Sequence, residues 1–183
     1  RVDGNLELRS LGPVRIGEVK GNMLARRVAG DLWIDNIYGN TSVKNVQGAF
    51  TVSGSIEGNL NLEEVDENIK VVASGILSAR LDPLPGNTYE LRAGGNMACW
   101  LPEDSSVEVN ILKASKIFVG FEADDIPKQM VAPCSFSLGD GEASVSLEAG
   151  GSLNVSGAPG FHQPAGFGVH VDFTAPEIPD HFG

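Results

Sequence analysis

The sequence has no run of about eighteen apolar residues, so no single helix of this chain is long and apolar enough to span a bilayer. It has only two cysteines, Cys99 and Cys134, which are too few for a disulfide scaffold. One bridge and two buried free thiols both fit this count, because cysteine also packs as a small hydrophobic side chain. Aromatic residues are scarce at 7%, whereas glycine occurs 23 times in 183 residues. This mix favours strands and tight turns over helices.

Positive charge is also scarce. The 13 Lys and Arg residues face 24 Asp and Glu residues, which gives a formal net charge of −11. Such a surface repels nucleic acid and anionic lipid, so we expect no nucleic-acid partner and no direct insertion into a membrane. No signal peptide is visible, but the sequence opens in mid-pattern at "RVDGNLELRS", so its absence does not identify a compartment.

The common signatures of catalysis and metal binding are missing. No Ser-His-Asp order, nucleophile elbow or phosphate-binding loop is present, and "GGNMAC" lacks the third glycine and following helix of a dinucleotide loop. The histidines lie close to the C-terminus, with acidic residues nearby, at spacings that match no ligand motif: His162, His170 and His181, with Asp172, Glu177 and Asp180. We therefore expect no catalytic residues, no cofactor and no metal.

Glycine instead recurs at every ninth residue, at Gly12, Gly21, Gly30, Gly39 and Gly48. Apolar residues occupy the second, fourth and seventh positions of each unit, apart from one threonine. The second position holds Val14, Met23, Leu32, Thr41, Phe50, Leu60 and Ile69. The fourth holds Ile16, Ala25, Ile34, Val43, Val52, Leu62 and Val71, and the seventh holds Val19, Val28, Ile37 and Val46.

This pattern predicts a short strand, a bend and a glycine turn in each unit. Such a unit buries its apolar side only by stacking on neighbours, which is the principle of a solenoid. With two units per coil, residues eighteen apart stack, which predicts the inward ladders Ile16–Ile34–Val52 and Ala25–Val43–Leu62. The outward position holds Arg15, Leu24, Trp33, Ser42, Thr51 and Asn61, among which Leu24 and Trp33 are unusually apolar.

Two other nine-residue architectures fit less well. A helix would lose about 1 kcal/mol at every glycine. A calcium-binding nonapeptide roll needs a Gly-Gly-x-Gly-x-Asp turn, whereas the turns here read "VKGN", "VAGD", "IYGN" and "VQGA". We therefore expect an all-β, single-chain parallel β-solenoid.

The nine-residue spacing of glycine and apolar residues changes after Ala79. The segment "LDPLPGNTYEL" contains two prolines and a Gly-Asn turn, which is typical of a connection. Period-two alternation then predicts longer strands that extend the same stack. We expect a solenoid domain over residues 1–157, repeat-rich over 4–81 and longer-stranded over 86–157, followed by a Pro- and aromatic-rich tail over 158–183.

The tail carries a further alternation, with Phe167, Val169, Val171 and Phe173 on one face of an extended strand. One interpretation is a final strand that packs on its own domain over Leu24 and Trp33. The other is a strand given to a neighbouring subunit. These six residues are the candidate interaction residues.

Two segments resemble a family of bacterial adhesin-like domains of unknown function, which are single-chain β-solenoids. They are "GGNMACWLPEDSS" and "LGDGEASVSLEAGGSLNV", and the likeness covers most of residues 4–157. The resemblance implies the fold and an association with surfaces and envelopes, and it transfers no catalytic residues.

The expected function is thus a non-enzymatic structural or adhesin-like β-solenoid of the cell envelope or extracellular space, with a cytoplasmic location as the alternative. Its partners would be other copies of itself, in fibres that grow from open solenoid ends, or another surface protein or a polysaccharide. The alternative function is a carbohydrate-active β-helix enzyme, for which the acidic clusters supply carboxylates: Glu63, Glu64, Asp66 and Glu67, and Asp124 and Asp125.

Overall fold

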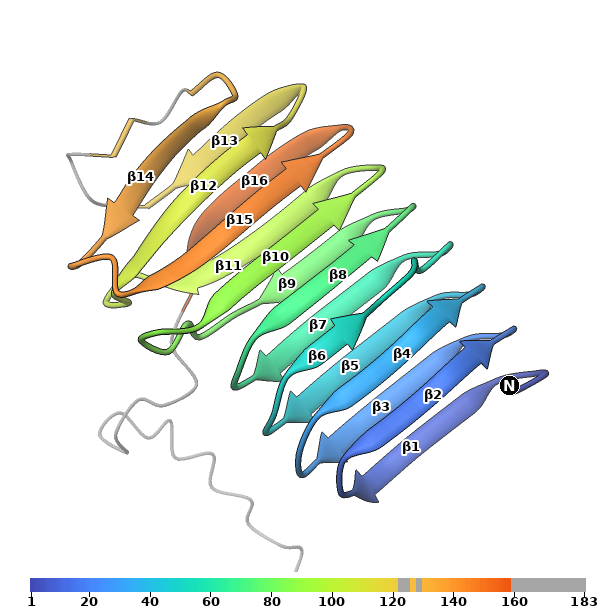
Figure 1. The fold of residues 1–183 in the computed structure, drawn as a ribbon. Coiled ribbons are helices and arrows are strands. Elements are labelled where there is room, and N and C mark those ends of the chain that lie inside the picture. The colour runs from blue at the N-terminus through green and yellow to red at the C-terminus, as the bar shows by residue number, and fades with distance from the viewer. Residues whose placement is uncertain (122–125, 128–129, 159–183) are drawn as a thin grey trace, which may run out of the picture.

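The computed structural model describes residues 1–121, 126–127 and 130–158, and these residues form an all-β solenoid. The chain passes alternately through two stacked sheets, so that each coil contributes one strand to each sheet over most of the length (Figure 1). All strand pairs are parallel except that of β12 with β14. The parallel β-solenoid expected from the sequence is therefore the fold of the protein.

We call the two eight-stranded layers the first and the second sheet. The first sheet contains, in spatial order, β1 (Leu6–Leu11), β3 (Met23–Val28), β5 (Thr41–Val46), β7 (Leu60–Val65), β9 (Leu77–Arg80), β11 (Met97–Pro102), β16 (Ser152–Ala158) and β13 (Lys116–Gly120). The second contains β2 (Val14–Val19), β4 (Leu32–Ile37), β6 (Phe50–Val52), β8 (Ile69–Ala73), β10 (Thr88–Ala93), β15 (Ala143–Ala149), β12 (Val107–Lys113) and β14 (Cys134–Leu138).

The strand registers confirm the predicted eighteen-residue coil, with one step of nineteen residues between Val43 and Leu62. In the second sheet Ile16 pairs with Ile34, and Ile34 pairs with Val52. In the first sheet the matching ladder is Ala25–Val43–Leu62. The apolar positions of the repeat point between the two sheets, where they form one continuous core. The repeat therefore exists because each coil buries its apolar side chains against the coils on both sides.

The glycines lie at the corners between sheets, as expected, but for two different reasons. Gly30 has a φ of +146°, which glycine adopts at little cost. Gly39 has no left-handed backbone; instead, a Cβ atom at Gly39 would lie 2.6 Å from the carbonyl oxygen of Gly21 in the preceding coil. Here glycine is required by the close stacking of one corner on the next.

Asparagine follows the corner glycine because its side chain ties adjacent coils together. The Oδ1 atom of Asn22 accepts a hydrogen bond from the backbone amide of Asn40 at 2.9 Å, and Asn40 accepts one from the amide of Asn59 at the same distance. Asn5 and Asn59 continue the ladder at its two ends. Each side chain thus satisfies a corner amide of the next coil.

The strands after β11 do not stack in chain order. We call β1–β9 the regular part and β10–β16 the interleaved part. The coil of β12 and β13 lies beyond an intervening coil, which is filled later by β15 and β16. In Figure 1 the orange β15 and β16 lie between the green β10 and β11 and the yellow β12 and β13.

The two ends of the solenoid are built differently. At the N-terminal end the inward side chains of Leu6, Val14 and Ile16 are only half-buried against the core. At the other end the antiparallel β14 closes the second sheet, and three further apolar side chains are buried there: Phe121, Ile126 and Phe136. Within the described residues, these three side chains therefore cover the core at the β14 end, whereas Leu6, Val14 and Ile16 are less deeply buried.

Candidate functional site

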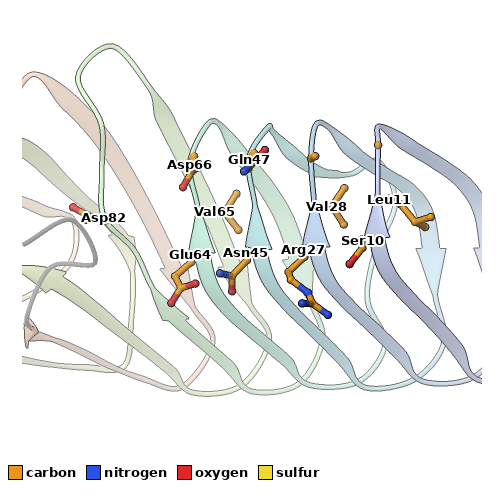
Figure 2. Close-up of a pocket in the computed structure, with 12 residues that line it drawn as sticks. Ser10, Leu11, Arg27, Val28, Asn45, Gln47, Glu64, Val65, Asp66 and Asp82 are labelled. Atoms are coloured by element: carbon orange, nitrogen blue, oxygen red, sulfur yellow. The ribbon is translucent and has the colours of Figure 1, made fainter.

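A groove of about 680 Å³ runs along the corner that leads from the first sheet to the second. We call it the corner groove. Its lining comes from β1, β3, β5 and β7 and from Asp82 after β9, so that it crosses successive coils parallel to the solenoid axis (Figure 2). Its volume is within the usual range of ligand sites.

The groove follows a column of four residues in the left-handed backbone conformation. Ser10, Arg27, Asn45 and Glu64 have φ values of 52°, 56°, 56° and 56°. Each occupies the same repeat position, the second of two consecutive outward-facing residues. After Arg27, Asn45 and Glu64 the next apolar residue returns to the core, whereas Leu11 after Ser10 is exposed. The left-handed residue makes this bend, which is how the chain leaves the first sheet.

The side chains of the column are presented on the surface of the groove. Figure 2 shows Ser10, Arg27, Asn45 and Glu64 in one row along successive coils, with Val28 and Val65 in a second row beside them. Asp66 and Gln47 form part of a third row. Val28 and Val65 are themselves buried, so the groove presents mainly the hydrogen-bonding groups of the two outer rows, with the exposed Leu11 toward its N-terminal end.

Charge is distributed unevenly along the groove. The guanidinium of Arg27 lies toward the N-terminal end, whereas the carboxylates Glu64, Asp66 and Asp82 lie toward the other end. Glu64 and Asp66 lie on opposite sides of Val65 in Figure 2. The arrangement can donate hydrogen bonds at one end and accept them at the other.

A surface ion pair lies next to the groove. Lys44 donates a hydrogen bond to Glu63 at 2.8 Å, and this bond and the charge of Glu63 raise the pKa of Lys44. The same hydrogen bond is the largest influence on Glu63, whose pKa is lowered. Glu63, from the acidic cluster noted in the sequence, is therefore a partner of Lys44, while Glu64 and Asp66 of that cluster line the groove.

The structure does not bring Leu24 and Trp33 together. Leu24 is on β3 in the first sheet and Trp33 is on β4 in the second, and both face outward. Trp33 is 41% exposed and lies beneath the guanidinium of Arg15, 4.9 Å from the ring centroid. The other four candidate interaction residues, Phe167, Val169, Val171 and Phe173, lie outside the described residues, as do the three histidines.

Both cysteines are free thiols. Cys99 is buried in β11, and burial raises its pKa to about 12. Cys134 at the start of β14 is half-buried, and its pKa is raised for the same reason. Of the two arrangements that the sequence allowed, the structure has two free thiols and no bridge.

Sequence reasoning missed Ser10, Arg27, Asn45 and Gln47 as groove residues. The signal available for the first three was the pair of polar residues between the fourth and seventh repeat positions. A regular strand cannot turn both members of such a pair to the same side, so a bend was required there. Nothing in the pattern indicated that the bend would expose these side chains along a groove.

Comparison with known proteins adds no relative: no family model, no curated protein and no solved structure matches the chain. Within the described part of the chain, no helix is long and apolar enough to cross a membrane. Over the same residues no group of three or more His, Cys, Asp or Glu side chains is arranged to hold a metal ion.

Proposed function

We propose that the protein is a non-enzymatic, adhesin-like β-solenoid of the cell surface or envelope whose corner groove binds an extended polysaccharide. The column of left-handed residues carries this proposal. Glycine would occupy such positions without steric cost, whereas a residue with a Cβ atom costs on the order of 1–2 kcal/mol, and asparagine less than most. Side chains thus stand at four positions whose backbone conformation sterically favours glycine, which supports a use for those side chains.

The shape of the groove supports a linear ligand. It crosses successive coils, which are spaced by roughly 4.8 Å as in any β-sheet. A chain laid along it would meet a new polar side chain at each coil. Sugar hydroxyls both donate and accept, so they can pair with the donor Arg27, the amides of Asn45 and Gln47, and the acceptor Glu64. The surface location rests on the resemblance of two segments to adhesin-like domains.

The test removes groove side chains while relieving backbone strain. The double variant Arg27→Gly/Asn45→Gly should keep or increase its melting temperature, because glycine tolerates the left-handed conformation. Binding to polysaccharides, found by array screening and measured by calorimetry, should fall at least about tenfold, roughly 1.4 kcal/mol. Arg26→Ala is the matched control, since Arg26 is also exposed but does not line the groove. Equal binding by the double variant and the control would refute the proposal.

A second candidate function remains because three carboxylates line the same groove: Glu64, Asp66 and Asp82. Glycoside hydrolases use a pair of carboxyl groups that flank the scissile bond. Incubation of the chain with each bound polysaccharide, followed by assay of new reducing ends, separates the two functions. The adhesin-like function predicts binding without cleavage. Cleavage that is lost in Glu64→Gln would establish the enzyme instead.

A further inference from the structure

A second cavity lies on the outer face of the first sheet, and we call it the Trp100 pocket. Its volume is about 490 Å³, which is within the usual range of ligand sites. The described residues that line it are different from those that line the corner groove. Its walls come from β7, β9, β11 and β16 and include Asn61, Glu63, Ser78, Arg80, Trp100 and Gly157.

The strand registers bring the side chains of this pocket together. Trp100 on β11 pairs with Arg80 on β9, and Arg80 pairs with Glu63 on β7. Asn61 and Ser78 are paired two residues earlier in the same strands. Because side chains alternate along a strand, these five residues all face away from the core. The stacking of coils therefore places an indole ring beside a group of polar side chains.

The polar groups of the pocket are held in position by one another. The Oε2 atom of Glu63 accepts a hydrogen bond from Lys44 at 2.8 Å, and its Oε1 atom accepts a longer one from Asn61 at 3.5 Å. A carboxylate has about four acceptor positions, so Glu63 has capacity for further hydrogen bonds. The amide of Asn61 and the hydroxyl of Ser78 both donate and accept. A ligand would thus meet donors and acceptors whose positions are already fixed.

Positive and negative charges are balanced around the pocket. A second carboxylate lies at its edge, because a Cβ atom at Gly157 would collide with the side chain of Glu103. Two cations offset the two carboxylates: Lys44 is bonded to Glu63, and Arg80 pairs with Glu63 in the strand register. This balance favours a neutral ligand over an anion or a cation.

The two tryptophans of the chain differ in what lies against them. The ring of Trp33 is covered by the guanidinium of Arg15, which lies 4.9 Å from its centroid. Trp100 is half-buried and lines a cavity. An indole in such a place offers an apolar surface to a ligand. A pyranose ring has C–H groups on its faces and hydroxyl groups around its edge, so it matches an indole with polar side chains beside it.

We propose that the Trp100 pocket binds one neutral pyranose unit, which stacks on the indole ring while its hydroxyl groups pair with Asn61 and Glu63. A site of this kind recognises a single sugar unit, such as a chain end or a side branch. The corner groove, by contrast, is proposed to follow an extended chain. The pocket does not depend on the groove, because different residues line the two sites.

Tryptophan fluorescence of the 183-residue chain provides the first test. The sequence has two tryptophans, so Trp33→Phe leaves Trp100 as the reporter. Titration with the methyl glycosides of glucose, galactose and mannose should change the emission saturably for at least one sugar, with a Kd on the order of 1 mM. In this background Asn61→Ala should weaken binding at least about threefold, because a hydrogen bond is lost. Ser42→Ala is the matched control, since Ser42 pairs with Asn61 on the adjacent strand and does not line the pocket.

Saturation-transfer difference NMR, which detects the bound sugar itself, compares the two tryptophans. Trp100→Ala should abolish the sugar signal, and Trp33→Ala should retain it. The groove variant Arg27→Gly/Asn45→Gly should also retain it, which separates failure of this proposal from failure of the groove. Circular dichroism checks the fold of each variant, and the exposed Asn61 keeps the test valid if Trp100→Ala does not fold.

Three results would overturn the proposal. The first is no response to any of the neutral sugars at concentrations far above the expected Kd. The second is equal binding by the wild type and a folded Trp100→Ala variant, or by Asn61→Ala and Ser42→Ala, which would place the sugar elsewhere. The third is binding confined to a charged sugar, such as glucosamine or glucuronic acid, which would mean that the pocket selects a charge and not a neutral ring.

Discussion

The regular and the interleaved parts of the solenoid are built from the same kind of coil, but the order in which successive coils stack differs between them. In the regular part each strand pairs with the strand one coil later, as in Met23 with Thr41. In the interleaved part β11 pairs with β16, so that Met97 contacts Leu153. After β11 the chain skips the position of one coil and forms β12 and β13 beyond it. It then returns and forms β15 and β16 in the skipped position.

This difference separates two properties that a repeat sequence can encode. The period of the apolar residues determines the size of a coil, because it determines which side chains face the core. It does not determine the order in which coils stack, because every coil offers a similar strand edge. Closing the longer segment between β11 and β16 costs only about 1 kcal/mol more than closing one coil, since the entropy rises slowly with length. The interleaved order is therefore accessible at small cost.

The largest expected effect is the loss of the interleaved part alone. Val155→Asp places a charge at a fully buried position of β16, next to Cys99 on β11, and should cost at least about 4 kcal/mol. β12–β16 should become sensitive to protease while the regular part remains folded. Labelling of the Cys99 thiol should become fast, because β16 covers it. Asn154→Asp is the control, since Asn154 is the exposed neighbour in the same strand. Global unfolding of the whole chain would show that the two parts are one cooperative unit.

The second prediction compares matched cavities in the two parts. Ile34 on β4 and Leu147 on β15 are both fully buried, so Ile34→Ala and Leu147→Ala should each cost about 2–5 kcal/mol. The extent of the accelerated hydrogen exchange should differ. Ile34→Ala should affect the adjacent β2 and β6, whereas Leu147→Ala should release β12–β16 together, because β15 joins β10 to β12. Identical exchange patterns around the two sites would contradict this account.

The third prediction compares how tightly the corners stack. A Cβ atom at Gly39 would lie 2.6 Å from the carbonyl oxygen of Gly21, whereas one at Gly95 would lie 3.0 Å from that of Gly75. Gly39→Ala should therefore cost about 1–3 kcal/mol, and Gly95→Ala should cost less. Gly12→Ala is the control, because no atom lies within 4 Å of a Cβ placed there. Urea melts of the three variants give the order, and a reversed order would show that close stacking is not what requires glycine.

The sequence predicted the fold class, the coil length and the inward ladders, because apolar periodicity reports burial directly. It could not predict the interleaving, because the alternation of Val107 and Val109 resembles that of Val145 and Leu147. The corner groove could not be predicted from the sequence for a related reason. Two polar residues precede Val28, and the second of them, Arg27, is left-handed. Two polar residues also precede Ile37, but neither of them is left-handed. Only the stacked structure distinguishes these corners.

The smallest expected effect concerns the asparagines that tie coils together in the two parts. Asn40 accepts one hydrogen bond, from the amide of Asn59 nineteen residues later. Asn96 accepts two, from the amide and the hydroxyl of Ser152, fifty-six residues later. Since a net hydrogen bond contributes about 0.5–1.5 kcal/mol, Asn40→Ala should cost about 1 kcal/mol and Asn96→Ala somewhat more.

These two variants should also differ in what they loosen. Asn40→Ala should speed exchange mainly at the amide of Asn59, because neighbouring coils of the regular part remain paired on both sides. Asn96→Ala should speed exchange along the start of β16, because the bonds to Ser152 fix the point at which the returning chain enters the open coil. Asn154→Ala, in the middle of β16 and facing outward, is the control for a lost surface amide. An equal effect of Asn96→Ala and Asn154→Ala on exchange in β16 would contradict this account. The position of β16 would then depend on its buried side chains, such as Leu153 and Val155, and not on the hydrogen bonds between Asn96 and Ser152.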